Sequence, residues 1–138
     1  MLGLLPEIGA VALGGACGAT LRYLTGVGVA HAFAASNPIY PFPLSTFLAN
    51  VIGCFAMGFL SVVFEGADSP NAALWKTFAT TGVLGGFTTM STFSLETVSL
   101  FDSGAAGTGT LNLVLTLVVC LGFIVLGRAL AHAVLPAR

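Results

Sequence analysis

Residues 82–94 read Gly-Val-Leu-Gly-Gly-Phe-Thr-Thr-Met-Ser-Thr-Phe-Ser, and they lie in the middle of a long apolar run. Glycines weaken a helix because they lose backbone entropy without adding side-chain contacts. Backbone that leaves the helix at membrane depth is tolerated only inside protein or beside water. The stretch therefore predicts a broken helix whose carbonyls, amides and hydroxyls bind an ion. The alternative is a smooth helix in which small residues allow close packing.

The composition is that of an integral membrane protein. The chain has 138 residues, of which 57% are hydrophobic and 7% charged, and its mean hydropathy is +1.02. A soluble domain carries about 25% charged residues. The net charge of −1 excludes the basic footprint of a nucleic-acid-binding protein. Because the sequence has no catalytic triad, phosphate-binding loop or zinc motif, we do not expect an enzyme.

The apolar pattern predicts one all-α transmembrane domain over residues 1–138, with helices at about 2–33, 44–64, 72–101 and 111–130. About 20 apolar residues cross a hydrocarbon core. The third segment would span about 45 Å as one straight helix, so tilt or interruption is expected there. We expect loops at the proline-rich residues 36–43, at residues 65–71 and at the Gly/Ala/Ser/Thr-rich residues 102–110.

Two polar residues in the first two segments each allow two interpretations. Arg22, next to Tyr23, is either an interfacial anchor that reaches water or part of a polar vestibule that attracts an anion. The residues leave these two evenly balanced. Asn50 lies one turn after Thr46 and needs a partner in hydrocarbon. It forms either a hydrogen bond between helices or a donor lining a pore, and the nearby broken helix favours the pore.

Other polar and sulfur-containing residues receive weaker assignments. Glu96 is the carboxylate well inside a predicted segment, so it should face protein or water. Asn112 and Thr116 lie one turn apart in the fourth segment, without an assigned role. Three cysteines lie in different segments without metal-ligand spacing, and their pattern indicates packing rather than metal or disulfide chemistry (Cys17, Cys54 and Cys120).

The distribution of basic residues predicts little preference for one orientation in the membrane. Four crossings place both termini on one side, together with Lys76, Arg128 and Arg138, whereas Arg22 lies on the other side. Such a weak bias lets a chain insert in both directions. Four helices enclose little polar surface, so the hydroxyls on several of them indicate a homo-oligomer.

Three stretches together resemble the Fluc/CrcB family of small fluoride channels. They are residues 14–23 (Gly-Gly-Ala-Cys-Gly-Ala-Thr-Leu-Arg-Tyr), residues 46–53 (Thr-Phe-Leu-Ala-Asn-Val-Ile-Gly) and residues 82–93. The family's third-segment pattern is similar to G-x-x-G-G-x-T-T-F-S-T-F-S. Order, spacing and four-segment length agree over nearly the whole chain, which makes the resemblance specific.

The resemblance implies an antiparallel, dual-topology homodimer in the cytoplasmic membrane, as in the bacterial inner membrane. It implies passive fluoride export, which protects the cell from an anion that enters as HF. The backbone carbonyls of Gly85 and Thr88 would hold a central structural Na⁺ shared by both subunits. The implied fluoride pathway is lined by Asn50, Ser91, Thr92 and Phe93, with Arg22 in the vestibule.

One position departs from the family pattern. Met90 stands where the family usually has its first phenylalanine, and a thioether lacks the electropositive ring edge that can face an anion. Its contact with fluoride is therefore not implied.

The alternative function is a small dual-topology, proton-coupled multidrug transporter, which needs a membrane-buried carboxylate such as Glu96. A purely structural subunit would leave the broken helix without a use.

Overall fold

The computed structural model describes residues 4–33, 41–66 and 69–135, and every element in this part is helical. The elements are α1 (Leu4–Ala32), α2 (Leu44–Val63), α3 (Pro70–Lys76), the π-helix η1 (Thr77–Leu84), α4 (Gly85–Phe87), α5 (Met90–Asp102) and α6 (Ala106–Val134). The predicted helix start at residue 2, most of the proline-rich loop and Arg138 lie outside the described residues.

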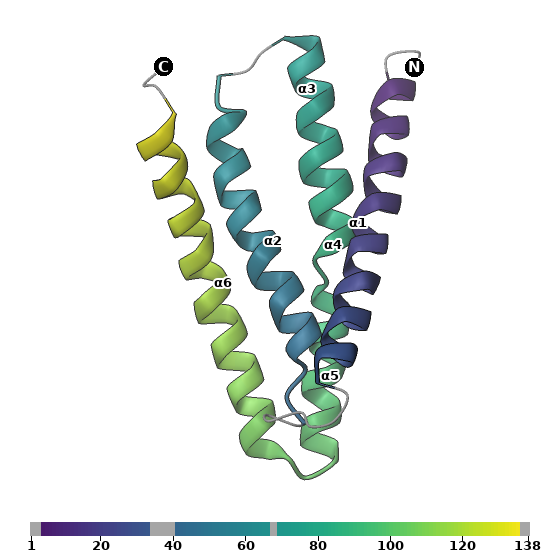
Figure 1. Ribbon diagram of the computed structural model, residues 1–138, viewed down its shortest axis with the longest axis vertical. Coiled ribbons are helices and arrows are strands. Elements are labelled where there is room, and N and C mark those ends of the chain that lie inside the picture. The colour runs from purple at the N-terminus through teal and green to yellow at the C-terminus, as the bar shows by residue number, and fades with distance from the viewer. Residues whose placement is uncertain (1–3, 34–40, 67–68, 136–138) are drawn as a thin grey trace.

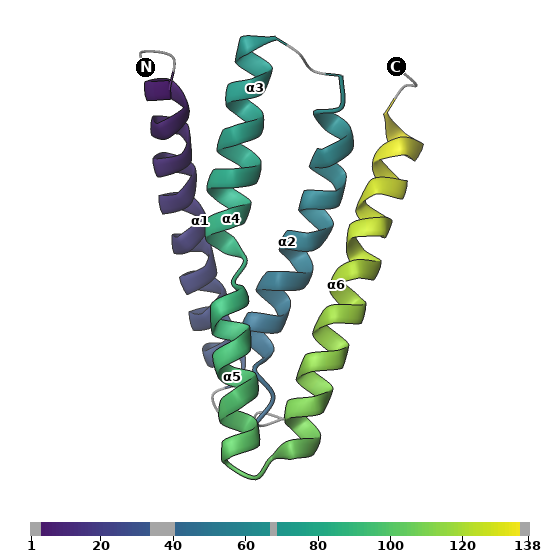
Figure 2. The same ribbon diagram turned by 180° about the vertical axis from the view of Figure 1, so that it is seen from behind.

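Within the described residues, α1, α2 and α6 are long and apolar enough to cross a membrane. The third segment, from α3 to α5, is bent and interrupted, and it runs beside α1 (Figures 1 and 2). The expectation of a multi-pass, all-helical membrane protein is confirmed. The turns after α2 and α5 lie at opposite ends, so α1 begins and α6 ends at the same end of the molecule (Figure 1).

The helices pack as two parallel pairs. α1 packs along η1 and α4 and runs in their direction, whereas α2 packs along α6 and runs in the opposite direction to the first pair (Figure 2). α5 lies at the narrow end, where it contacts α6. This arrangement leaves the interrupted third segment between α1 on one side and α2 on the other.

The glycines of residues 82–86 are helical, which corrects the expectation that they form the break, and two of them, Gly82 and Gly86, pack against α1. A Cβ added to Gly82 would lie 2.9 Å from the Gly14 Cα, and one on Gly86 would lie 2.7 Å from the Gly15 carbonyl oxygen. The small residues of α1, including the Gly14 and Gly18 pair, thus let two backbones touch. The break itself falls two residues later, at Thr88 and Thr89.

Replacing Gly18 with alanine should lower the free energy of unfolding by about 1–3 kcal/mol, as expected for overpacking. The added methyl would overlap the Val83 carbonyl oxygen and lie 2.8 Å from the Phe87 amide nitrogen. Thermal unfolding in detergent measures the effect. Gly26→Ala is the matched control, because a Cβ at Gly26 meets nothing within 4 Å. Equal melting temperatures for both variants would contradict this account of the α1 contact.

The end of the third segment shows why the predicted loop at residues 102–110 is wrong in its second half. Gly104 has a φ of 81°, and the Ala105 and Gly104 amides donate to the Leu100 and Phe101 carbonyls at 2.9 and 3.0 Å. This Schellman turn ends α5. α6 then begins at Ala106 rather than near residue 111, since small residues pack there: a Cβ on Gly109 would lie 3.2 Å from the Phe101 ring.

Candidate functional site

The third segment is broken between α4 and α5. Thr88 (φ −79°, ψ 156°) and Thr89 (φ −151°, ψ 112°) are both extended. The Thr88 amide still donates to the Leu84 carbonyl at 3.0 Å, which closes the last turn of α4. Thr89 caps α5, because its Oγ1 accepts from the Thr92 amide at 3.2 Å. The prediction of a broken helix at this stretch is confirmed.

Asn50 of α2 holds the broken backbone in place. The Thr89 amide donates to Asn50 Oδ1 at 2.8 Å, and Asn50 Nδ2 donates to the Thr89 carbonyl at 3.2 Å. The side-chain amide thus replaces the backbone partners that a continuous helix would supply. Asn50 is buried, with 8% of its surface exposed. The interhelical hydrogen bond considered for Asn50 is therefore present, while a second Nδ2 hydrogen remains available to another acceptor.

The break deprives two carbonyls of their helical donors. In a continuous α-helix the Gly85 carbonyl would accept from Thr89, and the Thr88 carbonyl from Thr92. Here the Thr89 amide bonds to Asn50, and the Thr92 amide bonds to the Thr89 hydroxyl. Gly85 is also exposed on the surface of the subunit. These are the two carbonyls that the sequence suggested as cation ligands.

Three hydroxyls gather at the start of α5. Thr89 Oγ1 donates to Thr92 Oγ1 at 2.9 Å and lies 3.3 Å from Ser91 Oγ. Thr89 is buried and Ser91 is exposed. Ser91 and Thr92 are thereby connected through Thr89 to Asn50, so the structure brings three of the predicted site residues into one hydrogen-bonded group.

A polar cavity of about 180 Å³ lies beside this group, between α1, α2 and α5. Its lining residues are Arg22, Ser45, Thr46, Thr89, Thr92 and Glu96. The structure therefore places Arg22, which the sequence left open between an anchor and a vestibule, against the same space as Thr92. A cation and several hydroxyls at one concave surface can attract a small anion and replace part of its hydration shell.

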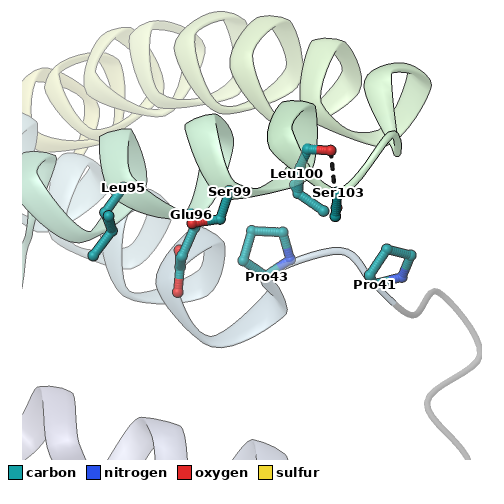
Figure 3. Close-up of a pocket in the computed structure, with 7 residues that line it drawn as sticks. All are labelled: Pro41, Pro43, Leu95, Glu96, Ser99, Leu100 and Ser103. Carbon is teal, nitrogen blue, oxygen red and sulfur yellow. Dashed lines mark hydrogen bonds between the residues drawn. The ribbon is translucent and has the colours of Figure 1, made fainter.

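Glu96 lines this cavity and also a second one of about 420 Å³. Figure 3 shows Glu96 reaching from α5 towards the first turn of α2, near Pro43. Thr46 Oγ1 donates to Glu96 Oε1 at 2.9 Å. Glu96 Oε2 is buried and has no hydrogen-bond partner among the residues that the structure describes. The expectation that Glu96 faces protein rather than lipid is met.

Met90 and Phe93, which occupy the two phenylalanine positions of the family pattern, lie in different environments. Phe93 is buried, with 3% of its surface exposed, whereas Met90 is 66% exposed. One turn of α5 thus directs Phe93 into the subunit and Met90 outwards. The structure does not bring Met90 into the hydrogen-bonded group around Thr89.

A buried polar chain fixes α5 against α6. Asn112 Nδ2 donates to Thr97 Oγ1 at 2.8 Å, and Thr97 Oγ1 donates to the Phe93 carbonyl at 2.7 Å. Thr116 Oγ1 donates to Asn112 Oδ1 at 3.3 Å. Buried polar groups require such partners, so Asn112 and Thr116, which had no assigned role, support the helix that carries Phe93.

Sequence reasoning missed Thr89 and the Thr46–Glu96 contact. The spacing placed Thr46 one turn before Asn50 on the same face of α2, but it gave no sign that Thr46 would bond to Glu96. Thr89 carried no signal that set it apart from Thr88, and which of the two faces Asn50 depends on the backbone angles of the break.

Comparisons with known proteins show which family of sequences this chain resembles. Residues 9–128 match the family model described as CrcB-like protein, Camphor Resistance (CrcB). The chain is 42% identical over 125 residues to a protein of Ruminiclostridium cellulolyticum named fluoride-specific ion channel FluC, covering 91% of this chain and 92% of the relative.

Two further relatives carry the same name. One from Clostridium perfringens is 41% identical over 122 residues, covering 88% of this chain and 91% of the relative. One from Cereibacter sphaeroides is 47% identical over 97 residues, covering 70% and 71%. With the matched region spanning the broken third segment and its Asn50 clamp, this chain belongs to the CrcB (Fluc) family.

Proposed function

We propose that this protein is a fluoride-selective channel that lets fluoride leave the cell passively across the cytoplasmic membrane. The observation that carries the proposal is the polar cavity at the helix break, where Arg22 and Thr92 share one space. The relatives named as fluoride-specific channels support the same ion.

The chemistry around the break suits a small, strongly hydrated anion. Hydroxyls and amide hydrogens replace water by donating hydrogen bonds, and Ser91 and Thr92 supply two such hydroxyls within one turn, next to Thr89. A buried ring such as Phe93 adds an electropositive edge. The sequence has no Lys or Arg between Lys76 and Arg128. An anion that meets weak donors in sequence can leave as readily as it enters.

A structural Na⁺ fits the two carbonyls that the break releases. Unwound backbone carbonyls at membrane depth coordinate Na⁺ in other transport proteins. Gly85 and Thr88 offer two such oxygens within one turn, and Gly85 is exposed at the subunit surface. Two oxygens are too few for a hard cation, so a second copy of the chain would supply the other two. An experimental structure of the dimer that shows no cation density between four carbonyl oxygens at the two-fold axis would contradict this proposal.

The proposed assembly is an antiparallel homodimer of two oppositely inserted copies. Its support is the weak positive-charge bias, together with the polar groups that the single subunit leaves at its surface, among them Thr81, Ser91 and Ser94. These hydroxyls would otherwise face lipid. A parallel arrangement in cysteine cross-linking would contradict the proposal.

The decisive experiment is ion efflux from liposomes that contain the purified protein. We expect fluoride to leave rapidly, chloride to stay, and the internal pH to stay unchanged once the membrane potential is balanced by a potassium ionophore. Protein-free liposomes are the control. The alternative, a proton-coupled multidrug transporter that uses Glu96, predicts instead that uptake of an organic cation is matched by proton release without fluoride efflux.

Met90→Phe should preserve fluoride efflux to within about threefold, a change of less than about 1 kcal/mol. Met90 is 66% exposed, so a ring at this position enters space outside the subunit without displacing its core. Initial efflux rates at matched protein density measure the effect. A dead variant that remains folded and oligomeric would show that Met90 does not lie at a tolerant edge of the pathway.

A further inference from the structure

Two cysteines that are far apart in the sequence lie together between α2 and α6. Cys54 belongs to α2 and Cys120 to α6, and both are free and half-buried. Each lies four residues before one member of the closely packed Gly58 and Ile124 pair, so the two side chains stand at the same level of the interface and near enough to interact. The fold thus brings together two cysteines that the sequence places in different segments.

The packing of the two helices explains why these thiols meet. α2 and α6 run in the same direction, and a Cβ on Gly58 would overlap the backbone of Ile124. One turn earlier on both helices stand Cys54 and Cys120, at the same sequence offset. A Cβ on Gly127 would likewise overlap the backbone of Phe55. Backbone contact on this face holds the two helices close enough for short side chains to touch across the interface.

The type of ligand, the number of ligands and the net charge together limit which metal ions a pair of thiols can bind here. Thiolates prefer soft cations, whereas Ca²⁺ and Mg²⁺ require oxygen ligands. Structural Zn²⁺ requires four ligands, and the described residues include no cluster of three or more His, Cys, Asp or Glu side chains. Two thiolates and a monovalent cation would leave a net negative charge in apolar surroundings, which is costly. Two thiolates and a divalent cation make a neutral unit.

We propose that Cys54 and Cys120 form an intramembrane dithiol site for a soft divalent cation that accepts two ligands, for which Hg²⁺ is the representative. Mercuric chloride is uncharged and enters the bilayer as such. Each thiol loses its proton as the metal binds: two S–H bonds and two Hg–Cl bonds break, two Hg–S bonds form, and two equivalents of HCl leave. No electrons are transferred, so the step needs no oxidant.

The test is retention of mercury against a competing monothiol. Cys17→Ala protein, which keeps only the Cys54 and Cys120 pair, is treated with mercuric chloride and then washed in excess β-mercaptoethanol. Metal analysis should find one mercury per chain. A single thiol loses its mercury by exchange, whereas the second thiol acts at high effective concentration, so retention should exceed that of a single-thiol variant by roughly 10²-fold.

Two variants in the Cys17→Ala background, Cys54→Ala and Cys120→Ala, are the matched controls, since each keeps one thiol at the same interface. Intact-mass measurement should show one mercury in place of two hydrogens on a single chain. Failure of the Cys17→Ala protein to retain mercury would overturn the proposal. This outcome does not depend on whether the Cys54→Ala and Cys120→Ala variants fold. Retention by a single-thiol variant, or mercury joining two chains, would also overturn it. Because the readout is metal content, the result is independent of whether the protein conducts fluoride.

Discussion

Replacing Asn50 with aspartate should lower fluoride efflux by about tenfold or more. Aspartate can still accept from the Thr89 amide, but it cannot donate to the Thr89 carbonyl, which lies 3.2 Å from Asn50 Nδ2. An oxygen would then face an oxygen in a buried position, and a buried polar group left without its partner costs about 1–3 kcal/mol. The added negative charge also repels the anion. Initial efflux rates from liposomes measure the effect.

Asn71→Asp is the matched control, because it makes the same chemical change at an exposed residue of α3. It should leave efflux unchanged. Both variants should be checked for their oligomeric state before reconstitution. Normal conduction by Asn50→Asp would mean that neither the Thr89 clamp nor the remaining Nδ2 hydrogen of Asn50 serves the anion pathway.

Gly85→Val should also reduce efflux by about tenfold or more, a change of at least about 1.4 kcal/mol. A clash of the added Cβ with the rest of the subunit is not the reason, because a Cβ at Gly85 would lie 3.7 Å from the Thr80 carbonyl oxygen, which is ordinary contact. The backbone at Gly85 is ordinary helix (φ −63°, ψ −36°). A loss of function would therefore report on what lies outside the subunit: the proposed cation and the second copy.

Gly28→Val is the control for the β-branched side chain itself, since Gly28 is helical, exposed and open on the side of its missing Cβ. Thr88→Ser should be mild, because it keeps both the carbonyl and the hydroxyl that donates to Leu84 at 2.9 Å. If Gly85→Val and Gly28→Val conduct equally well, no ion or partner lies against the Gly85 carbonyl, and the shared cation site is wrong.

The sequence predicted the helices well where they are continuous, because uninterrupted apolar runs have few alternatives in a membrane. α1 ends, and α2 begins and ends, within about two residues of the expected positions. α6 is longer than expected at both ends. At its start, Gly109 looks like a loop residue by composition but packs against the Phe101 ring. The π-helical turns of η1, which packs along α1, were not predicted.

The sequence indicated which polar residues matter for the candidate site but not how they are arranged. Asn50 and Arg22 stood out because each needs a partner or water, and Thr92 was implied by the family resemblance. The sequence could not show that the glycines stay helical while Thr88 and Thr89 are extended, since this difference follows from close contacts between Gly82 or Gly86 and α1. It also could not show that Glu96 bonds to Thr46, since the two lie 50 residues apart.

The clamp between Asn50 and Thr89 has a consequence for biosynthesis. α2 is made and inserted before the third segment exists, so the Asn50 amide enters the bilayer ahead of the backbone groups that bond to it. The break in the third segment, in turn, cannot be satisfied by its own residues alone. Each segment is therefore costly in lipid until the other arrives. A nascent chain that stops before residue 88 would carry this uncompensated amide in the bilayer, so α2 alone is a poorer membrane segment than α2 in the finished subunit.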